Sequence, residues 1–504
     1  MGKFDDIVVG SGIGGMTLAL LLAETGRSVL LVEKSRAIGG SMLRFYRDGV
    51  PFDTGFHFTG GFVGQSLLRD MLQLVGIDEM IRPVFVGGSK GSSRILIESH
   101  DREFDLPTGC AAAADALKGY FPGEHGAIDA YFATAQRVCD RTAGMSLRQP
   151  AAFPVLLPED QISLDEGLGR LTSDAALKAV LSIYAMTYGT RPSEISFANH
   201  CRVAQGMHES VARVENGGDA FVRAFRTRAQ GLPIELKRAT TIVECADVQN
   251  RTVGRFVLSD GEEVAADHCT FTIHPYDILK TLPREHIKKA FVNRVTDFEP
   301  TIGMFAVYGV LDSPEPVSPS EAFGPSILSL LPTPDVDAMF DPHREGDQAL
   351  VVMRSIETAG SRSHRVVNVL EISFTEHIRQ WLHCRAGERD ESYLEYKERH
   401  VERIKERLFA VYPEYRGSYR VVKAASPLTF REFLNSPDGS AYGVKQKIGQ
   451  HSLFGRLPFR NLFAAGQSAM LPGVIGSMAA SVVVGRGIIG NDAYVRLLGE
   501  RLGI

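Results

Sequence analysis

The residues best suited to chemistry lie near the start of the chain, where glycines are spaced to hold a diphosphate. Gly10, Gly12 and Gly15 form a GxGxxG pattern directly after an apolar run at 7–9. In such a pattern Gly10 permits a tight turn, Gly12 lets a diphosphate approach the main chain, and Gly15 lets a helix pack on a strand. The first N–H groups of that helix then face the diphosphate. The spacing therefore predicts a dinucleotide site.

An acidic residue and a second glycine pair narrow the choice of dinucleotide. Glu33 ends an apolar run at 29–32, where a carboxylate can accept hydrogen bonds from a ribose diol. Its charge disfavours NADP, whose 2′-phosphate it would repel. Gly39 and Gly40 follow soon after. This arrangement resembles FAD enzymes of the glutathione-reductase-like superfamily, in which a second glycine pair wraps the longer cofactor, so we expect FAD.

The far end of the chain offers a partner for this block. An apolar strand expected at 462–465 ends at Gly466 and Gln467, and Pro472 and Gly473 open a helix of small and apolar residues. A strand, a glycine turn and a helix start suit a flavin ring edge or its ribityl phosphate. The alternative is a buried helix that uses small residues only for close packing. Its pairing with the N-terminal block favours the cofactor.

The composition limits the other functions that need to be considered. The 504 residues are 44% hydrophobic and carry a formal net charge of −5, so no basic surface for nucleic acid is expected. The six cysteines show no metal-ligand spacing, and we expect no metal site. The run 462–485 lacks charge, but glycines and Pro472 interrupt it, so no transmembrane helix is predicted. We expect a cytoplasmic protein.

The apolar patterns predict an α/β fold with an inserted α+β substrate domain, and the resemblance of the glycine motifs implies that the other domain is a glutathione-reductase-like, Rossmann-type FAD-binding domain. The FAD-binding domain should be discontinuous and comprise residues 1–75, 215–280 and 445–504. The substrate-binding domain should comprise residues 76–214, which are rich in helix signals, and 281–444. The β-rich runs of the last range predict a mostly antiparallel sheet.

Individual elements can be placed by their periodicity. Residues 217–274 carry strand runs and a hairpin turn, which predict a return to the cofactor sheet. A charged helix at 390–410 should bury one apolar face, formed by Leu394, Val401, Ile404 and Leu408. The other expected helices are 67–75, 111–119, 127–139, 164–181 and 221–229, and the expected strands include 263–266, 269–273, 302–311, 326–331, 349–354 and 366–374.

Two further stretches are specific enough to suggest a family. Residues 52–60 read FDTGFHFTG, while 426–430 and 436–443 read SPLTF and SPDGSAYG ahead of Gly466. With the glycine motifs, these stretches resemble the phytoene desaturase, carotenoid isomerase and retinol saturase family of FAD-dependent oxidoreductases. The aromatic-flanked His57 after the Asp-Thr-Gly turn is similar to the retinol-saturase-like branch. The middle of the chain matches in pattern only.

The resemblance implies a position for each part of the cofactor site. Val474 and Ile475 would lie under the flavin. Two positions depart from the family pattern, because Ser41 stands where many relatives have Arg and Gln467 where many have Asp. A positive contact to the diphosphate then comes from Arg44 or is absent, while Gln467 can still donate a hydrogen bond. By position the FAD site comprises Gly10, Ser11, Gly12, Gly14, Gly15, Glu33, Lys34, Gly39, Gly40, Ser41, Val243, Gly466 and Gln467.

The activity that the resemblance implies is hydride transfer between the flavin and a C=C or C–C bond of a lipophilic, carotenoid- or retinoid-like polyene. Saturation, desaturation and cis–trans isomerisation all fit, and the segment around His57 favours saturase-like or isomerase-like chemistry. No second GxGxxG is visible, so we expect an external electron donor or acceptor. A lipophilic substrate also implies peripheral contact with a membrane surface, through residues within 76–214.

Several roles stay open at this stage. His57 is the candidate for moving the second proton, and the alternative is a structural histidine bonded to the 53–54 turn. Tyr442 is either turn packing or substrate wall. An amine-oxidase-like flavoenzyme would need an aromatic cage, which a chain with one tryptophan, Trp381, disfavours; a non-catalytic prenyl- or lipid-binding protein of this fold would lack the phosphate-binding glycines. The candidates for either a polyene tunnel or ordinary core are Phe45, Tyr46, Phe52, Phe56, Phe58 and Phe62.

Overall fold

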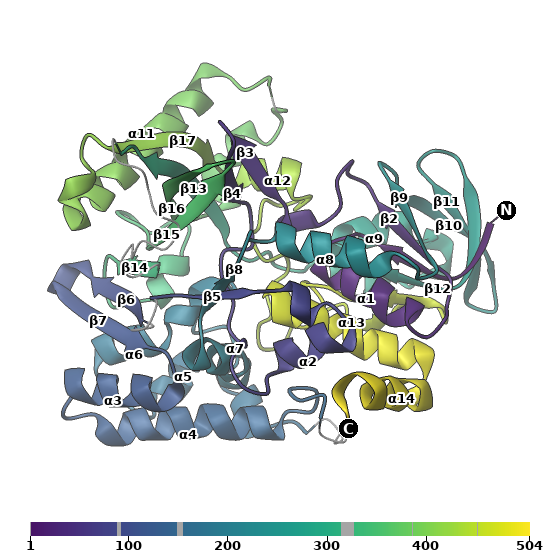
Figure 1. The fold of residues 1–504 in the computed structure, drawn as a ribbon, viewed down its shortest axis with the longest axis horizontal. Helices are drawn as coiled ribbons and strands as arrows, with labels where there is room; N and C mark the ends of the chain where they lie inside the picture. Colours follow the sequence, from purple (N-terminus) through teal and green to yellow (C-terminus); the bar gives the residue numbers. More distant parts are fainter. Residues whose placement is uncertain (1, 88–91, 149–154, 314–326, 386, 451) are drawn as a thin grey trace.

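Two β-sheets organise the molecule, and each combines segments from distant parts of the sequence (Figure 1). An eight-stranded sheet contains the N-terminal strand, and a seven-stranded sheet lies beside it with a layer of helices below. The computed structural model describes residues 2–87, 92–148, 155–313, 327–385, 387–450 and 452–504.

The eight-stranded sheet has a parallel centre. β1 (Gly2–Val9) lies between β12 (Glu263–Phe271) and β2 (Val29–Glu33), and all three run parallel. β9 (Ile234–Arg238) extends the sheet beyond β2, and β19 (Leu462–Ala464) pairs in parallel with the last residues of β12. β2 and the second half of β1 are fully buried, as parallel strands covered on both faces require. The predicted return of the middle of the chain to this sheet is confirmed.

A hairpin and a short edge strand complete this sheet. β10 (Ile242–Gln249) and β11 (Thr252–Leu258) pair antiparallel, and β11 also pairs with the start of β12. β18 (Gly455–Arg456) pairs with β19. The separate strands expected at 263–266 and 269–273 are one strand, β12, because its first residues pair with β11 and its last with β19.

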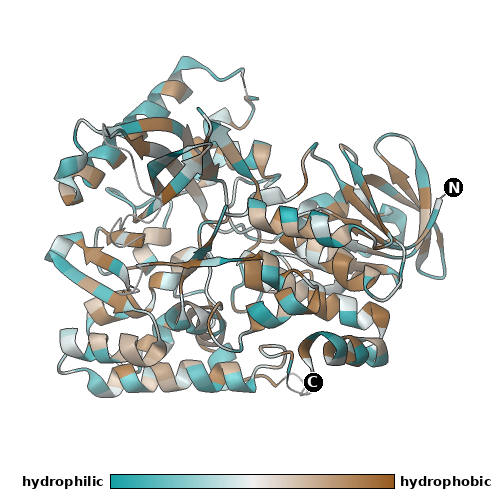
Figure 2. Ribbon diagram, in the orientation of Figure 1, coloured by the Kyte–Doolittle hydropathy of each residue, from teal (hydrophilic) through white to brown (hydrophobic). Residues whose placement is uncertain are grey.

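Two helices from opposite ends of the chain pack against each other on this sheet. α1 (Ile13–Ala23) packs against α13 (Gly473–Ile489), and both are hydrophobic almost throughout (Figure 2). A Cβ added at Gly485 would lie 2.5 Å from Leu21, so glycine permits this close approach. The same side carries α2 (Leu67–Leu74), α8 (Asp219–Ala229) and α14 (Asn491–Leu502), and the other side carries α9 (Pro275–Thr281) and α10 (Lys289–Thr296).

The seven-stranded sheet is antiparallel except between β14 and β6. The predicted mostly antiparallel sheet is therefore confirmed, although Ser326 of the expected strand 326–331 lies outside the described residues. The strand order is β17 (Tyr419–Ala425), β13 (Gly303–Leu311), β16 (Arg362–Ser373), β15 (Leu350–Ala359), β14 (Ile327–Leu331), β6 (Ser92–Ile97) and β7 (Arg102–Pro107).

The predicted helical character of residues 76–214 is only partly right. β6 and β7 join the seven-stranded sheet, and β5 (Pro83–Phe85) pairs with β8 (Ala212–Val214). These strands are short, and β5 is exposed along its length, so no continuous apolar run marks them. β15 and β16 form a tight hairpin that fills most of the gap between the expected strands 349–354 and 366–374. The domain boundaries themselves stay a prediction.

Helices cover both faces of the second sheet. α11 (Glu391–Val411) packs on one face through Tyr393, Tyr396, Ile404 and Leu408. Leu394, expected in this face, is 58% exposed, because the two tyrosines take the buried positions of that turn. None of the helices in the described ranges is both long and apolar enough to span a bilayer.

The face of the second sheet opposite α11 is covered by a layer of shorter helices. The single helix expected at 164–181 is two, since the Asp174 side chain accepts from the N–H of Leu177 and starts a new helix. α12 (Pro427–Phe433) and the hairpin of β3 (Arg44–Arg47) and β4 (Val50–Asp53) lie near the junction of the two sheets (Figure 1). The helical layer comprises α3 (Cys110–Tyr120), α4 (His125–Arg141), α5 (Leu164–Gly169), α6 (Ala175–Leu181) and α7 (Phe197–Glu209).

Candidate active site

A crevice of about 390 Å³ lies where parallel strands of the first sheet end together. β1, β2, β12 and β19 all finish at this edge, and the residues that follow them form the crevice walls. Nucleotides bind at such carboxyl edges in open α/β sheets. Of the predicted FAD-site residues, Gly10, Ser11, Gly12, Gly14, Glu33, Lys34, Gly40, Ser41, Val243, Gly466 and Gln467 line the crevice.

The first glycines take the roles that their spacing predicts. Gly10 has a positive φ of 96°, a left-handed conformation that favours glycine. A Cβ at Gly15 would lie 1.8 Å from the Gly10 carbonyl oxygen, so Gly15 permits the helix to touch the turn. A Cβ added at Gly12 would have nothing within 4 Å, so the space beside its main chain is open to the crevice. The backbone thus leaves room for a diphosphate at the start of α1.

Glu33 is held in place before any ligand binds. Its carboxylate accepts from the Ser11 N–H (3.0 Å) and hydroxyl (2.6 Å), and from the Ser35 N–H (2.7 Å). The side chain is buried and lines the crevice. Two bonded oxygens fix the carboxylate orientation, which suits a group that accepts hydrogen bonds from a ribose.

The later glycines bring the two motif blocks together. Gly39 donates its N–H to the Ser11 carbonyl (3.0 Å), and a Cβ at Gly40 would lie 3.3 Å from the Gly12 Cα. A Cβ at Gly14 would lie 3.1 Å from the Ser477 carbonyl and 3.3 Å from the Gly466 Cα. Gly14 therefore both lines the crevice and packs closely behind it, whereas Gly15 and Gly39 do not line it and act through packing and main-chain contacts.

The positive groups at the crevice are lysines. Lys34 and Lys280 line its walls, and Lys280 pairs with Asp277 at 2.7 Å. Arg44, one of the two alternatives for a contact to the diphosphate, does not line the crevice. Its guanidinium lies 2.9 Å from Asp53 and 2.5 Å from Glu357 instead. The Arg44 alternative is therefore wrong.

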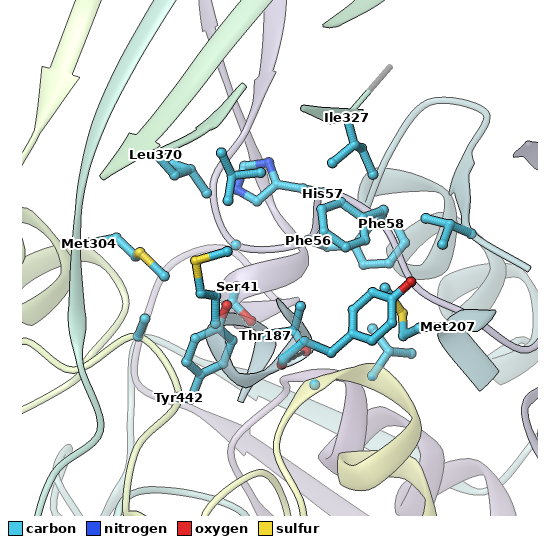
Figure 3. A pocket seen from close by; sticks show the side chains of 18 of the residues that line it. Ser41, Phe56, His57, Phe58, Thr187, Met207, Met304, Ile327, Leu370 and Tyr442 are labelled. Carbon is cyan, nitrogen blue, oxygen red and sulfur yellow. Dashed lines mark hydrogen bonds between the residues drawn. The ribbon is translucent and has the colours of Figure 1, made fainter. Parts of the chain in front are cut away.

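An apolar pocket of about 180 Å³ opens beside this crevice, under the second sheet. Its roof is one face of that sheet, where Ile95, Ser329, Val351 and Leu370 lie opposite one another on β6, β14, β15 and β16. The helical layer supplies Met207 and other side chains from below (Figure 3). Several strands and helices thus share one cavity wall.

The two cavities share part of their walls. Ile13, Ser41, Gln467 and Ser477 line both of them, and so do Leu434 and Ala441. These residues come from the starts of α1 and α13, from the second glycine pair and from the loop after α12. A cofactor extended along the crevice would therefore reach the pocket at this junction.

The pocket wall is free of charge. Among the residues that the structure describes, none with a charged side chain lines it. Among these described lining residues, His57 alone has a side-chain nitrogen that can titrate. Burial, together with the positive charge of Arg213, lowers the pKa of His57 to about 3. Tyr184 and Tyr442 also line the wall, and neither hydroxyl has a hydrogen-bond partner in the described part of the chain. The pocket thus suits an uncharged ligand.

His57 lies on a rigid strap, residues 53–59, that crosses the pocket wall (Figure 3). Thr59 fixes one end through two main-chain hydrogen bonds of 2.9 Å with Ala212. At the other end Asp53 contacts Arg44 (2.9 Å) and Arg213 (2.6 Å). Among the described residues, His57 makes no hydrogen bond to the 53–54 turn, so the structural alternative for this histidine is not supported.

A buried cluster of four charges supports this strap. Arg44 and Arg213 each bridge Asp53 and Glu357, at distances between 2.5 and 2.9 Å. Burial opposes ionisation, yet the charges of Arg213 and Arg44 lower the pKa of Glu357. The cluster joins the β3–β4 hairpin and β8 to β15 of the second sheet. The sequence does not reveal it, because its members lie up to 313 residues apart.

The aromatic candidates divide between the pocket and the core. Phe56 and Phe58 line the pocket, as does Tyr442. Phe45 and Phe52 pack instead against Tyr308, and Phe62 is core. Tyr46 is exposed and donates to Asp219. Trp381 packs against Tyr393 and Tyr396 under α11, away from the pocket.

Val474 and Ile475, both predicted to lie under the flavin, also differ in position. Val474 lines the pocket at the start of α13. Ile475 does not line either cavity and packs near Gly61, where an added Cβ would lie 3.3 Å from its Cδ1. Successive helical residues point in different directions, so one of the two faces the core.

Comparison with known proteins agrees with this arrangement. The description "NAD(P)-binding Rossmann-like domain" matches residues 8–73. All-trans-retinol 13,14-reductase of Macaca fascicularis is 25% identical over 99% of this chain and 88% of its own. Hydroxyneurosporene desaturase of Rubrivivax gelatinosus is 28% identical over 53% of this chain and 52% of its own. The crystal structure of an oxidoreductase from Methanosarcina mazei covers 96% of this chain and 99% of its own, with a TM-score of 0.62 at 15% identity.

The sheet and the glycine-lined crevice form a Rossmann-type dinucleotide-binding fold, and the relatives are named as a reductase and a desaturase, so the chain is an oxidoreductase with a flavin or nucleotide cofactor. The predicted resemblance to the phytoene desaturase, carotenoid isomerase and retinol saturase family is confirmed by a retinol reductase that matches nearly the whole chain and a desaturase that matches about half of it.

Proposed function

We propose that the protein is an FAD-dependent oxidoreductase that acts on a C=C or C–C bond of a lipophilic, carotenoid- or retinoid-like polyene. The observation that carries this proposal is an uncharged, mostly apolar pocket that shares its wall with a dinucleotide crevice. An uncharged substrate can enter this pocket at little cost in free energy, because neither the substrate nor the pocket wall has a charged group that would lose its hydration. Relatives named as a retinol reductase and as a hydroxyneurosporene desaturase support the substrate class.

The residues present fit FAD. The open space over Gly12 and the start of α1 would hold the diphosphate, and Glu33 would bind the ribose diol. Val243 and Lys34 would flank the adenosine half, while Ser41, Gln467 and Val474 lie at the junction with the pocket. When bound, the flavin supplies the donor or acceptor of hydride.

The pocket residues would bind and orient the polyene and exclude water. Met304, Met207 and Leu370 present flexible or branched apolar surface to a conjugated chain (Figure 3). A protonated amine would find no carboxylate among the described lining residues, which disfavours the amine-oxidase-like alternative. The open phosphate site over Gly12 likewise disfavours the non-catalytic lipid-binding alternative.

We propose that His57 handles the second proton of the reaction. Its side chain lies in the pocket wall, and its low pKa keeps the imidazole neutral at neutral pH. A neutral ring can accept a hydrogen bond or a proton, but it cannot rest as an imidazolium. We therefore expect a pH–rate profile without a break near the ordinary histidine pKa of about 6.5. In His57→Gln the rate should fall by about 100-fold or more; full activity would assign His57 a structural role.

The electron partner and the site of action are further parts of the proposal. An external donor or acceptor would exchange electrons with the flavin, and peripheral contact with a membrane surface would deliver the polyene to a cytoplasmic protein. Val84 and Phe85 are exposed on β5, whose neighbour Val86 lines a small recess beside the pocket. If all of the protein stays soluble in a vesicle flotation assay, this contact is excluded.

The decisive test is cofactor content. Purified protein should show flavin absorbance, directly or after adding FAD. If no flavin binds, the oxidoreductase proposal fails.

The reaction type can then be assigned with photoreduced enzyme under anaerobic conditions. Incubation with a panel of polyenes should give products whose mass distinguishes the alternatives. An unchanged mass means isomerisation, and a gain of two hydrogens means saturation. Oxidised enzyme that removes two hydrogens would mean desaturation. A panel with no conversion in either direction would remove polyenes as the substrate class.

A further inference from the structure

One loop contributes residues to the walls of both the crevice and the pocket. Residues 434–442, here called the partition loop, follow α12 and lead to Gly443. Asn435, Ser436 and Ser440 face the crevice, while Tyr442 stands in the pocket wall (Figure 3). The position of this loop therefore fixes the shape of both cavities.

The loop is tied to the second sheet by hydrogen bonds. The Ala441 N–H donates to the Ile302 carbonyl (2.8 Å), and the Tyr442 N–H donates to the Thr301 hydroxyl (3.1 Å). The Thr375 hydroxyl donates to the main-chain carbonyl of Asp438. These contacts hold one side of the loop to the ends of β13 and β16.

On the other side, Asp438 faces the first sheet. Its Oδ1 accepts from the Ser440 N–H (3.0 Å) and the Ser436 hydroxyl (3.2 Å), which folds the loop into a compact turn. Its Oδ2 lies 3.5 Å from Nε2 of His274. Both of these atoms are buried, and neither makes a hydrogen bond to any described residue, so each has the other, at 3.5 Å, as its polar contact. Each therefore depends on the other to offset its loss of hydration.

The local geometry of His274 sets which nitrogen carries the proton. Its Nδ1 accepts from the Tyr276 N–H (3.3 Å) at the start of α9, so this nitrogen bears no hydrogen. The hydrogen of the neutral ring is then on Nε2, the nitrogen that lies 3.5 Å from the Asp438 carboxylate. His274 follows β12 and lines the crevice, so the contact spans from the cofactor edge to the partition loop.

We infer that His274 and Asp438 form a latch that positions the partition loop, so that occupancy of the crevice and occupancy of the pocket are energetically coupled. This inference rests on the proposed function, because it takes a dinucleotide as the crevice ligand. A ligand on either side of the loop restrains it, and the second ligand then loses less conformational freedom on binding. By linkage the coupling is reciprocal and should amount to about tenfold in affinity.

The test measures binding rather than catalysis. All-trans-retinol is titrated into the full chain, with its own fluorescence as the readout, first without and then with saturating FAD. FAD affinity is measured in parallel by the change in flavin fluorescence. In the unmodified protein, FAD should tighten retinol binding about tenfold, and retinol should tighten FAD binding by the same factor.

Two variants break the latch in different ways. In His274→Asn the shorter side chain still caps α9, as Asn does well, but does not reach Asp438. Asp438→Asn keeps an oxygen for Ser436 and Ser440 and turns an N–H group towards Nε2. In both, each ligand should still bind while the coupling factor falls towards one. Asp312→Asn is the control, since it removes an exposed carboxylate that pairs with Arg420 and lines neither cavity, and its coupling factor should stay near that of the unmodified protein.

The outcomes separate this inference from the proposed function. Absence of FAD binding removes both. Normal FAD and retinol binding without coupling in the unmodified protein, or full coupling in a folded latch variant, overturns the latch alone. Failure of retinol to bind in either state also overturns it. Thermal denaturation identifies a variant that fails to fold. The other variant is then compared with the unmodified protein: a lower coupling factor supports the latch, and an equal one overturns it.

Discussion

The crevice and the pocket are neighbours built on opposite principles. The crevice is formed by the main chain of two short glycine-rich segments and by the ends of parallel strands. The pocket is formed by side chains that arrive singly from two sheets and a helical layer. A wall of main chain has no side chain that can move aside for an added atom or for a ligand displaced by it, whereas a wall of side chains can repack. Substitutions should therefore act very differently in the two cavities.

The largest effects should come from single methyl groups in the crevice. In Gly15→Ala the new Cβ would lie 1.8 Å from the Gly10 carbonyl oxygen, so α1 has to move off its strand. We expect a loss on the order of 4 kcal/mol or more in unfolding free energy. Denaturant unfolding measures this loss, and a stably folded Gly15→Ala protein would contradict the described packing.

Gly12→Ala provides the matched contrast. Gly12 has φ −63° and ψ 177°, which any residue adopts, and nothing lies within 4 Å of the added Cβ. Folding should be unaffected, while FAD should bind roughly 100-fold more weakly, about 3 kcal/mol, because the methyl group occupies the diphosphate position. An unchanged FAD affinity would place the diphosphate elsewhere.

The same contrast explains what the sequence reveals. Gly10, Gly15 and Glu33 owe their roles to main-chain geometry, which recurs wherever a diphosphate binds at a helix start, so their spacing predicts the crevice. The meeting of α1 and α13 was also predictable, since one long ligand needs both ends of the chain. Arg44 was misplaced because sequence shows a positive charge but not the acids, Asp53 and Glu357, that bind it.

The pocket was far less predictable. Its roof depends on the pairing of β6 with β14, which lie more than 200 residues apart, and of β14 with β15, which are joined by the irregular segment 332–349. Short strands such as β6 give no distinct apolar run, and the sequence does not show which face of a strand is buried. Phe56 and Phe52 look alike in sequence, yet one lines the pocket and the other packs on Tyr308.

The four-charge cluster should give the largest effect on the pocket side. Glu357→Gln leaves Arg44 and Arg213 with Asp53 alone, an uncompensated buried charge that should cost about 3–5 kcal/mol of unfolding free energy. Because the cluster holds the strap of His57, retinol affinity should fall while FAD affinity changes little. Asp312→Asn, which removes an exposed partner of Arg420, should cost at most about 1 kcal/mol. Equal losses in the two variants would contradict a supporting role for the cluster.

The layer below the pocket should respond to pH. Burial lowers the pKa of His208 to about 4, and its ring contacts Tyr184 of the pocket wall at a centroid distance of 5.0 Å. Below about pH 6.5 the unfolded chain takes up a proton on this residue, but the folded state does not until about pH 4. Stability therefore falls as the pH falls through this window, by up to about 1.4 kcal/mol per pH unit.

His208→Gln should remove this part of the pH dependence. Unfolding by denaturant at pH 7 and pH 5 measures it, with the exposed His286→Gln as the control. If the two variants show the same difference between pH 7 and pH 5, His208 is not buried as a neutral ring.

The smallest effects should come from the two hydroxyl groups that face the pocket. Tyr184 and Tyr442 each keep an unpartnered hydroxyl in the described structure, so Tyr184→Phe and Tyr442→Phe remove no internal hydrogen bond. Their unfolding free energies should stay within about 0.5 kcal/mol of the unmodified value. Affinity for a hydrocarbon polyene should be unchanged in both variants. Affinity for a polyene alcohol should fall by about tenfold at most, and only in the variant that lacks the hydroxyl to which the alcohol binds. A side chain thus loses an oxygen with little consequence in one cavity, whereas a methyl group added at Gly12 disables the other. Destabilisation of both phenylalanine variants by several kcal/mol would show that the pocket wall is as intolerant as the crevice.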